Sequence, residues 1–213
     1  MPKQTFFNLS EQKRKKLLES AEIEFARAPL FEASIANIIK TAGISRGSFY
    51  QYFEDKDDLY FYLLEDKLKK GKIYFSALLA KHQGDVIEAL IELQNYFLLA
   101  LSDEEEKQFL KNALLFTTHR VESSFTSIWD TYLDNQEFKK VGELISRDYL
   151  NSTAEKELLH IFKMVSALAF NNLIEKTVKG LSDDEAMESF KLSMSLLKQG
   201  IYKKTTDQYG GVG

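Results

Sequence analysis

Apolar residues recur along most of the chain at spacings of three and four, which is the period of an amphipathic α-helix. Near the N-terminus, Leu17, Ala21 and Phe25 follow this spacing and predict a helix over residues 10–28, which Pro29 should end. No segment of appreciable length alternates apolar and polar residues as a half-buried strand does. We therefore expect an all-α fold.

Two short helices are expected next, over residues 35–41 and 45–52, with a tight turn between them. Ser34 and Ser45 are favourable N-cap residues, because a serine hydroxyl accepts a hydrogen bond from an orphan backbone N–H. Gly43 can adopt the left-handed conformation that a sharp turn between helices demands. Two short helices joined in this way, behind a longer first helix, predict a helix-turn-helix unit.

The rest of the chain is also periodic and contains no proline, so few residues interrupt its helices. Asp55 should cap a long fourth helix, and Gly180 should end a later one. Ser182 with Glu185 forms a capping-box pair at the start of the last helix. About nine helices are predicted in all, or ten when the segment 137–150 is counted. Those after the fourth are expected over residues 85–101, 103–118, 123–133, 137–150, 154–179 and 183–203.

The third helix, SRGSFYQY, divides into two faces of different chemistry. Phe49 and Phe53 lie four residues apart, so both should point inward and anchor the helix. Arg46 and Gln51 carry donors and acceptors that match guanine and adenine edges in the major groove of DNA. The tyrosine hydroxyls suit the sugar-phosphate chain, and Gly47 lets the backbone approach it closely. The outward residues are Ser45, Arg46, Gly47, Ser48, Tyr50, Gln51 and Tyr52.

Two further residues flank the helix-turn-helix unit as candidate phosphate ligands. Lys56 stands at the start of the fourth helix, where exposed backbone N–H groups and an ammonium can together hold one phosphate. Ser34 can donate its hydroxyl to another phosphate. The predicted DNA-binding residues are therefore Ser34, Ser45, Arg46, Gly47, Ser48, Tyr50, Gln51, Tyr52 and Lys56.

The run SIANIIKTAGISRGSFYQYFEDKDDLY, residues 34–60, closely resembles the N-terminal DNA-binding region of TetR-type (TetR/AcrR) transcriptional regulators. The matching features are the aromatic residue in FARA, the AGIS turn, the G-S-F-Y core, the YF pair and the K-x-x-L start of the fourth helix. The resemblance covers residues 10 to about 64. The chain departs from the family pattern at Pro29, where glycine is usual, and at Ala33, where threonine is common.

This resemblance implies a homodimeric, ligand-responsive DNA-binding regulator of transcription. Residues 1–54 would form a helix-turn-helix DNA-binding domain, residues 55–204 a helical ligand-binding and dimerisation domain, and residues 205–213 a frayed tail. The implied partners are a double-stranded DNA operator, a small-molecule ligand, and a second copy that pairs through the two C-terminal helices. The expected function is repression at a palindromic operator, relieved by a small apolar or aromatic ligand.

The C-terminal part of the chain is rich in aromatic residues, which either fill the core or line a ligand pocket. Asn171 and Asn172 interrupt the apolar run MVSALAFNNLIEK. A buried amide there needs a hydrogen-bond partner, either on a ligand or across a dimer. The candidate pocket residues are Phe97, Phe116, His119, Trp129, Tyr132, Phe162 and Asn171.

The residue types and motifs that the sequence lacks exclude several classes of protein. The chain has no cysteine, three scattered histidines and no phosphate-loop or nucleophile motif, so we expect no metal, no cofactor and no enzyme activity. No uncharged apolar run approaches the roughly 20 residues of a membrane span, and no secretory h-region is present, so a cytoplasmic protein is expected. A helical ligand carrier or partner-binding protein without sequence-specific DNA binding remains the alternative.

The charge is distributed unevenly along the chain, although its net value is only −4. Residues 1–56 hold nine basic and seven acidic side chains, whereas the remainder holds 19 basic and 25 acidic ones. This asymmetry favours a small anion-binding unit at the N-terminus of a more acidic body.

Overall fold

The computed structural model describes residues 1–102, 107–116, 119–122, 124, 143–150 and 154–199. Every regular element in these residues is a helix, which confirms the predicted all-α fold. The elements are α1 (Gln4–Phe7), α2 (Glu11–Arg27), α3 (Ile35–Ala42), α4 (Arg46–Tyr52), α5 (Lys56–Lys81), α6 (Val86–Ser102), α7 (Lys107–Leu115), η1 (Arg147–Tyr149), α10 (Glu155–Lys179) and α11 (Asp183–Gln199). Within this described part, no helix has both the length and the apolar character needed to cross a membrane.

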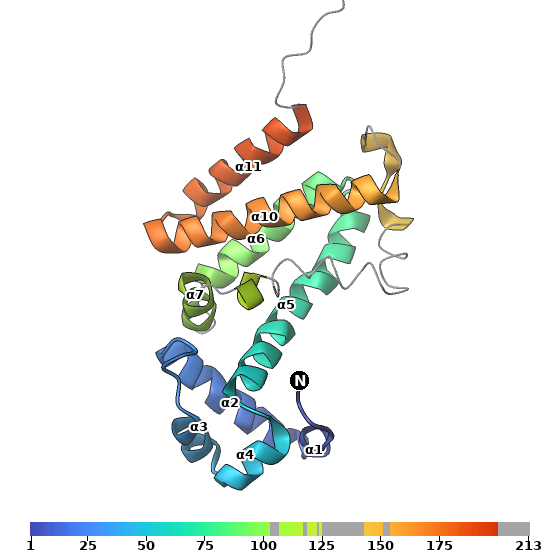
Figure 1. Ribbon diagram of the computed structural model, residues 1–213. Helices are drawn as coiled ribbons and strands as arrows, with labels where there is room; N and C mark the ends of the chain where they lie inside the picture. Colours follow the sequence, from blue (N-terminus) through green and yellow to red (C-terminus); the bar gives the residue numbers. More distant parts are fainter. Residues whose placement is uncertain (103–106, 117–118, 123, 125–142, 151–153, 200–213) are drawn as a thin grey trace, which may run out of the picture.

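The helices form two units that α5 connects (Figure 1). Helices α1 to α4 gather around the N-terminal end of α5, in the lower part of the view. Helices α6, α10 and α11 lie together in the upper part, and α7 lies between them and α2. The helix-turn-helix unit predicted from the sequence is therefore present as α3 and α4 at one end of the molecule.

Several predicted helix ends are confirmed. The backbone φ angle is 71° at Gly43 after α3 and 68° at Gly180 after α10, so both glycines adopt the left-handed conformation. Asp55 caps α5 by accepting a hydrogen bond at 2.8 Å from the N–H three residues later. At the start of α11, Glu185 accepts from the Ser182 N–H at 2.8 Å, and the Ser182 hydroxyl accepts from the Glu185 N–H at 3.2 Å.

Other predicted helix ends differ in detail. Ser10 and Ser34 stand at the N-cap positions of α2 and α3, but neither side chain accepts a capping hydrogen bond. Helix α1 has only four residues, which is too short for a periodic pattern to predict. The helix expected over 123–133 lies almost entirely outside the described residues, and the described part of 137–150 contains the 3₁₀ turn η1.

Two kinds of contact join the two units: aromatic rings that pack against one another, and the hydrogen bonds of one side-chain amide. The ring centroid of Tyr60 in α5 lies 5.1 Å from that of Phe25 in α2 and 5.2 Å from that of Phe109 in α7. The side-chain amide of Asn112 in α7 donates to the carbonyl oxygens of Phe25 and Ala26, at 3.0 Å each. Helix α7 therefore packs directly against the end of α2.

Buried amides tie the helices of the C-terminal unit together. Gln94 in α6 donates to Asn172 in α10 at 2.9 Å, and Asn172 donates to the carbonyl oxygen of Ala186 in α11 at 2.9 Å. Helix α6 also approaches α5 closely, since a Cβ at Gly71 would lie 2.6 Å from Cζ of Phe97. The hydrogen bonds of Gln94 and Asn172 satisfy polar groups that would otherwise destabilise an apolar core.

Candidate nucleic-acid interface and ligand cavity

Two phenylalanines anchor α4 from behind, as the sequence predicts. Phe49 and Phe53 are both fully buried, and their ring centroids lie 5.9 Å apart. The Phe53 ring also lies 5.0 Å from that of Phe6 in α1. These contacts fix the rotation of α4 about its axis, so the opposite side of the helix faces solvent.

The opposite side of α4 is polar. The Arg46 guanidinium lies 5.7 Å from the ring centroid of Tyr50 and donates to its hydroxyl at 3.3 Å. The Ser45 hydroxyl accepts from the Ser48 N–H at 3.0 Å and so caps α4, as predicted. This surface offers donors of the kind that contact base edges and phosphates. Ser45, Arg46, Gly47, Tyr50 and Gln51 are exposed, whereas Ser48 and Tyr52 are half-buried.

A buried carboxylate that the sequence analysis does not single out joins α2 to the start of α3. Glu24 is 4% exposed and accepts hydrogen bonds from Arg27, from the Ser34 N–H at 2.8 Å and from the Asn37 side chain at 3.2 Å. The bonds from Arg27, followed by those from Ser34 and Asn37, lower the pKa of Glu24 to about 2, although burial acts in the opposite direction. Glu24 thus satisfies the backbone N–H of Ser34, the N-cap residue of α3. Its signal in the sequence is an acidic residue seven positions after Leu17, on the apolar face of α2.

Lys56 lies at the first position of α5, and its ammonium contacts the protein's own backbone. Its Nζ donates to the carbonyl oxygens of Phe31 at 3.1 Å and Ala33 at 3.0 Å. An ammonium has three donors, so one remains for another acceptor. These bonds hold the loop between α2 and α3, which leads directly to Ser34.

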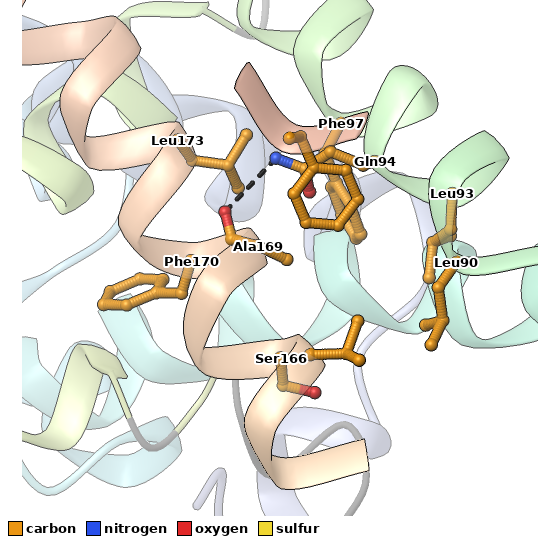
Figure 2. A pocket seen from close by; sticks show the side chains of 10 residues that line it. Leu90, Leu93, Gln94, Phe97, Ser166, Ala169, Phe170 and Leu173 are labelled. Carbon is orange, nitrogen blue, oxygen red and sulfur yellow. Dashed lines mark hydrogen bonds between the residues drawn. The ribbon is translucent and has the colours of Figure 1, made fainter. Parts of the chain in front are cut away.

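A cavity of about 40 Å³ lies between α6, α10 and α11 (Figure 2). Its lining is mostly apolar. Gln94 contributes a polar group at one side, where its amide donates to the Ala169 carbonyl oxygen at 3.2 Å, the dashed line in Figure 2. The lining residues are Leu90, Leu93, Gln94, Phe97, Val165, Ser166, Ala169, Phe170, Leu173 and Phe190.

Ser166 contributes a second polar group to the cavity. Its side chain is buried, at 7% exposure, and its Oγ has no hydrogen-bond partner among the described residues. A buried hydroxyl in this state is unfavourable by about 1–3 kcal/mol. Neither Gln94 nor Ser166 is singled out by the sequence analysis, although each is a polar residue on an otherwise apolar helix face.

The predicted pocket residues divide between this cavity and other places. Phe97 lines the cavity. Phe162 is buried outside the lining, where its ring centroid lies 6.1 Å from that of Phe75 in α5. Trp129 and Tyr132 lie outside the described residues.

Phe116, His119 and Asn171 are exposed and do not line this cavity. The ring centroid of Phe116 lies 5.5 Å from that of Phe31, at the junction of the two units. Asn171 faces outward on α10, whereas its neighbour Asn172 points inward to its hydrogen bonds. The reason is geometric, because successive residues of an α-helix are rotated by about 100° and two neighbours cannot share one narrow inward face.

The sequence matches two families of known proteins over most of the described residues. One is described as bacterial regulatory proteins, tetR family, and matches residues 17–63. The other is described as tetracyclin repressor-like, C-terminal domain, and matches residues 85–201, which is more than half of the chain. The first match contains α3 and α4, and the second contains the helices around the cavity.

Individual relatives and structures agree with these matches. The HTH-type transcriptional regulator AcrR of Shigella flexneri is 28% identical over 104 residues, which is 47% of this chain and 47% of AcrR. The uncharacterized HTH-type transcriptional regulator YfiR of Bacillus subtilis (strain 168) is 24% identical over 163 residues, 66% of this chain and 76% of YfiR. The chain thus spans about half the length of AcrR.

Two solved structures share the fold. A TetR-family transcriptional regulator from Syntrophomonas wolfei str. Goettingen has a TM-score of 0.62 at 19% identity, over 90% of this chain and 97% of that one. The TetR family regulator CifR, in a cysteine mutant complexed with 26-bp double-strand operator DNA, has a TM-score of 0.55 at 16% identity, over 85% of this chain and 95% of that one.

Proposed function

The chain belongs to the TetR family of DNA-binding transcriptional regulators, and from this premise we propose that it is a dimeric repressor that a small ligand releases from a palindromic operator. Residues 1–54 form the DNA-binding domain, and residues 55–204 form the ligand-binding and dimerisation domain. The proposed DNA contacts are Ser34, Ser45, Arg46, Gly47, Ser48, Tyr50, Gln51, Tyr52 and Lys56.

The burial of Phe49 and Phe53 is the observation that supports DNA recognition most directly. It leaves Arg46, Tyr50 and Gln51 exposed on the part of α4 that faces solvent. Arginine pairs with guanine and glutamine with adenine in the major groove, and tyrosine hydroxyls contact the backbone. Two such helices in a symmetric dimer enter successive major grooves about 34–36 Å apart, which requires a near-palindromic site.

An apolar stripe on α10 and α11 supports pairing with a second copy. Met164 and Val178 lie seven residues before and after Asn171, so the three share one face of α10, and the two apolar side chains are at least half exposed. Leu192 and Leu196 are likewise at least half exposed on α11. Apolar side chains grouped on two adjacent helices are typical of protein–protein interfaces. On this proposal Asn171 serves the dimer interface rather than the ligand cavity.

The cavity between α6, α10 and α11 supports a ligand site. Its apolar lining suits an apolar or aromatic compound that carries one hydrogen-bonding group for the Ser166 hydroxyl. Its volume of about 40 Å³ is smaller than the roughly 150 Å³ that admits a benzene ring, so a ring-sized ligand requires the lining side chains to move apart. A ligand that binds only the expanded state shifts the population toward that state.

Two structural routes link the cavity to the DNA-binding unit. In the first route, Phe97 lines the cavity and abuts Gly71 of α5. Helix α5 is a continuous helix of 26 residues, and its first residue, Lys56, donates hydrogen bonds to the loop before α3. Helix α7 packs on α10 and α6, and its Asn112 bonds the last turn of α2. A shift of α5 or α7 on ligand binding therefore changes the placement of the recognition helices.

Selection from a random pool of DNA duplexes by the full-length protein tests the DNA-binding proposal. We expect enrichment of a palindromic sequence that the protein binds more tightly than a scrambled duplex at the same salt concentration. Recovery of no enriched sequence overturns the proposal and favours a helical ligand carrier or partner-binding protein.

A crystal structure of protein purified without added ligand tests the ligand site. Electron density larger than water between α6, α10 and α11, within hydrogen-bond distance of Ser166 Oγ, is the expected result. Side chains that close this space completely, with Ser166 bonded to a neighbouring carbonyl, contradict it.

A further inference from the structure

The end of helix α4 contains backbone groups that the helix cannot satisfy by itself. Helix α4 has seven residues, and its last intrahelical bond runs from the Phe53 N–H to the Phe49 carbonyl oxygen at 2.9 Å. The carbonyl oxygens of Tyr50, Gln51 and Tyr52 therefore need hydrogen-bond donors from elsewhere in the chain. These three residues are also among the proposed DNA contacts.

The segment that precedes α2 supplies a donor to each of these carbonyl oxygens. The Lys3 ammonium donates to the Tyr50 carbonyl oxygen at 3.0 Å, and the Lys3 backbone N–H donates to that of Tyr52 at 2.8 Å. The Thr5 hydroxyl donates to that of Gln51. All three orphan carbonyls at the end of the proposed recognition helix are thus bonded by two residues that lie 46 to 49 positions earlier in the chain.

Phe6 fastens this segment to the core. Its side chain is fully buried, and its ring centroid lies 5.0 Å from that of Phe53 and 5.4 Å from that of Tyr62 in α5. Phe53 anchors α4 from the same side. One aromatic cluster therefore holds both the donor segment and the helix whose carbonyls it bonds.

We propose that residues 3–9, here called the N-terminal clamp, are a positioning element of the DNA-reading surface. The clamp fixes the backbone that carries Tyr50, Gln51 and Tyr52, and so increases sequence-specific binding without contacting bases. The physical reason is that a seven-residue helix is only marginally stable by itself and depends on such external bonds. The proposal rests on α4 being the recognition helix, as set out under the proposed function.

Substitution of Thr5 tests the clamp in the full-length protein. Thr5→Val keeps the shape of the side chain but removes the hydroxyl, whereas Thr5→Ser keeps the hydroxyl. We expect Thr5→Val to bind the duplex selected by the wild type about three- to tenfold more weakly, with little change for a scrambled duplex. Thr5→Ser should restore wild-type affinity. Gln4→Ala is the matched control, because Gln4 is exposed in the same helix and its side chain makes no hydrogen bond among the described residues.

Hydrogen exchange at the amides of residues 50–53 tests the same clamp without DNA. Thr5→Val and Phe6→Ala should both accelerate this exchange relative to Gln4→Ala, with the larger increase for Phe6→Ala. Equal exchange in Thr5→Val, Phe6→Ala and Gln4→Ala overturns the proposal, and so does unchanged specific affinity in Thr5→Val. If selection recovers no preferred duplex, the proposed function fails, and the exchange result alone decides whether the clamp holds α4.

Discussion

Asn112 in α7 donates a hydrogen bond to the carbonyl oxygen of Phe25 in α2, at 3.0 Å. The same amide nitrogen reaches the Ala26 carbonyl oxygen at an equal distance, so one side chain closes the last turn of α2. The C-terminal unit therefore supplies the hydrogen bonds that the end of an N-terminal helix lacks.

Asn112→Ala should lower the free energy of unfolding by about 1–3 kcal/mol, because it leaves two carbonyl oxygens at a buried junction without a donor. The measurement is urea denaturation followed by circular dichroism. Asn95→Ala is the control, since Asn95 is exposed on α6, and its effect should stay within about 0.5 kcal/mol. Equal losses in the two variants contradict a bridging role for Asn112.

Glu24 should make the stability of the protein depend on pH between about 4.5 and 2. Its pKa is lowered from 4.5 to about 2 in the folded protein, so its stabilising effect is complete above pH 4.5 and is lost as the pH falls toward 2. Because Arg27 is more than half exposed and solvent screens the pair, we expect this effect to be about 1–2 kcal/mol.

Glu24→Gln tests this dependence by denaturation at a series of pH values. The variant should be less stable than the wild type at pH 7 and should approach it near pH 2. Glu19→Gln is the control on the same helix, where an exposed ion pair with Lys15 at 3.7 Å should contribute little. A constant difference between Glu24→Gln and the wild type at all pH values rules out the predicted linkage.

Arg46→Ala and Tyr50→Ala should each abolish specific operator binding, with a loss of about tenfold or more, because they remove donors from the exposed side of α4. Gel-shift titration against the selected and scrambled duplexes measures this loss. The dimer should stay intact in both variants. Lys191→Ala is the control, because Lys191 is exposed on α11, and it should bind as the wild type does. Unchanged operator affinity in Arg46→Ala counts against the assignment.

Leu192→Lys should convert the protein to monomers at concentrations where the wild type is dimeric, since it places a charge in an apolar interface. Sedimentation velocity distinguishes the two states. Leu99→Lys is a matched control, because Leu99 is also more than half exposed but lies on α6. Dissociation by Leu99→Lys and not by Leu192→Lys moves the interface away from α10 and α11.

Ser166→Ala should leave the free energy of unfolding unchanged or raise it by up to about 1 kcal/mol, because the Ser166 hydroxyl is buried without a partner. Ser20→Ala provides the contrast, since Ser20 is also buried but donates to the Lys16 carbonyl oxygen at 2.7 Å. Ser20→Ala should therefore destabilise by about 1 kcal/mol. A comparable loss in Ser166→Ala shows that its hydroxyl is bonded in the folded protein.

Local features that act through the backbone could be predicted from the sequence. Gly43 and Gly180 end their helices in the left-handed conformation, and Ser45 and Asp55 cap theirs, because each effect depends on residues within one helical turn. The inward direction of Phe49 and Phe53 follows from their spacing in the same way.

Features that depend on distant partners could not be predicted. Glu24 bonds the N–H of Ser34, ten residues later, and Thr5 bonds a carbonyl oxygen 46 positions away, so neither role has a local pattern. The aromatic residues of the C-terminal unit all have helical spacing, and this spacing does not distinguish Phe97 in the cavity from Phe162 in the core. Periodicity indicates that a side chain is buried but not which neighbour it meets.

The bonds from Lys56 to the loop before α3 have a consequence for the entropy of binding. A lysine side chain that becomes fixed loses about 2 kcal/mol of rotamer freedom at room temperature. In this protein the carbonyl oxygens of Phe31 and Ala33 already restrain the Lys56 ammonium. An anion that binds at the start of α5 would therefore meet an ammonium whose position is already fixed. Most of the side-chain entropy of Lys56 would have been lost on folding, and little more would be lost on binding.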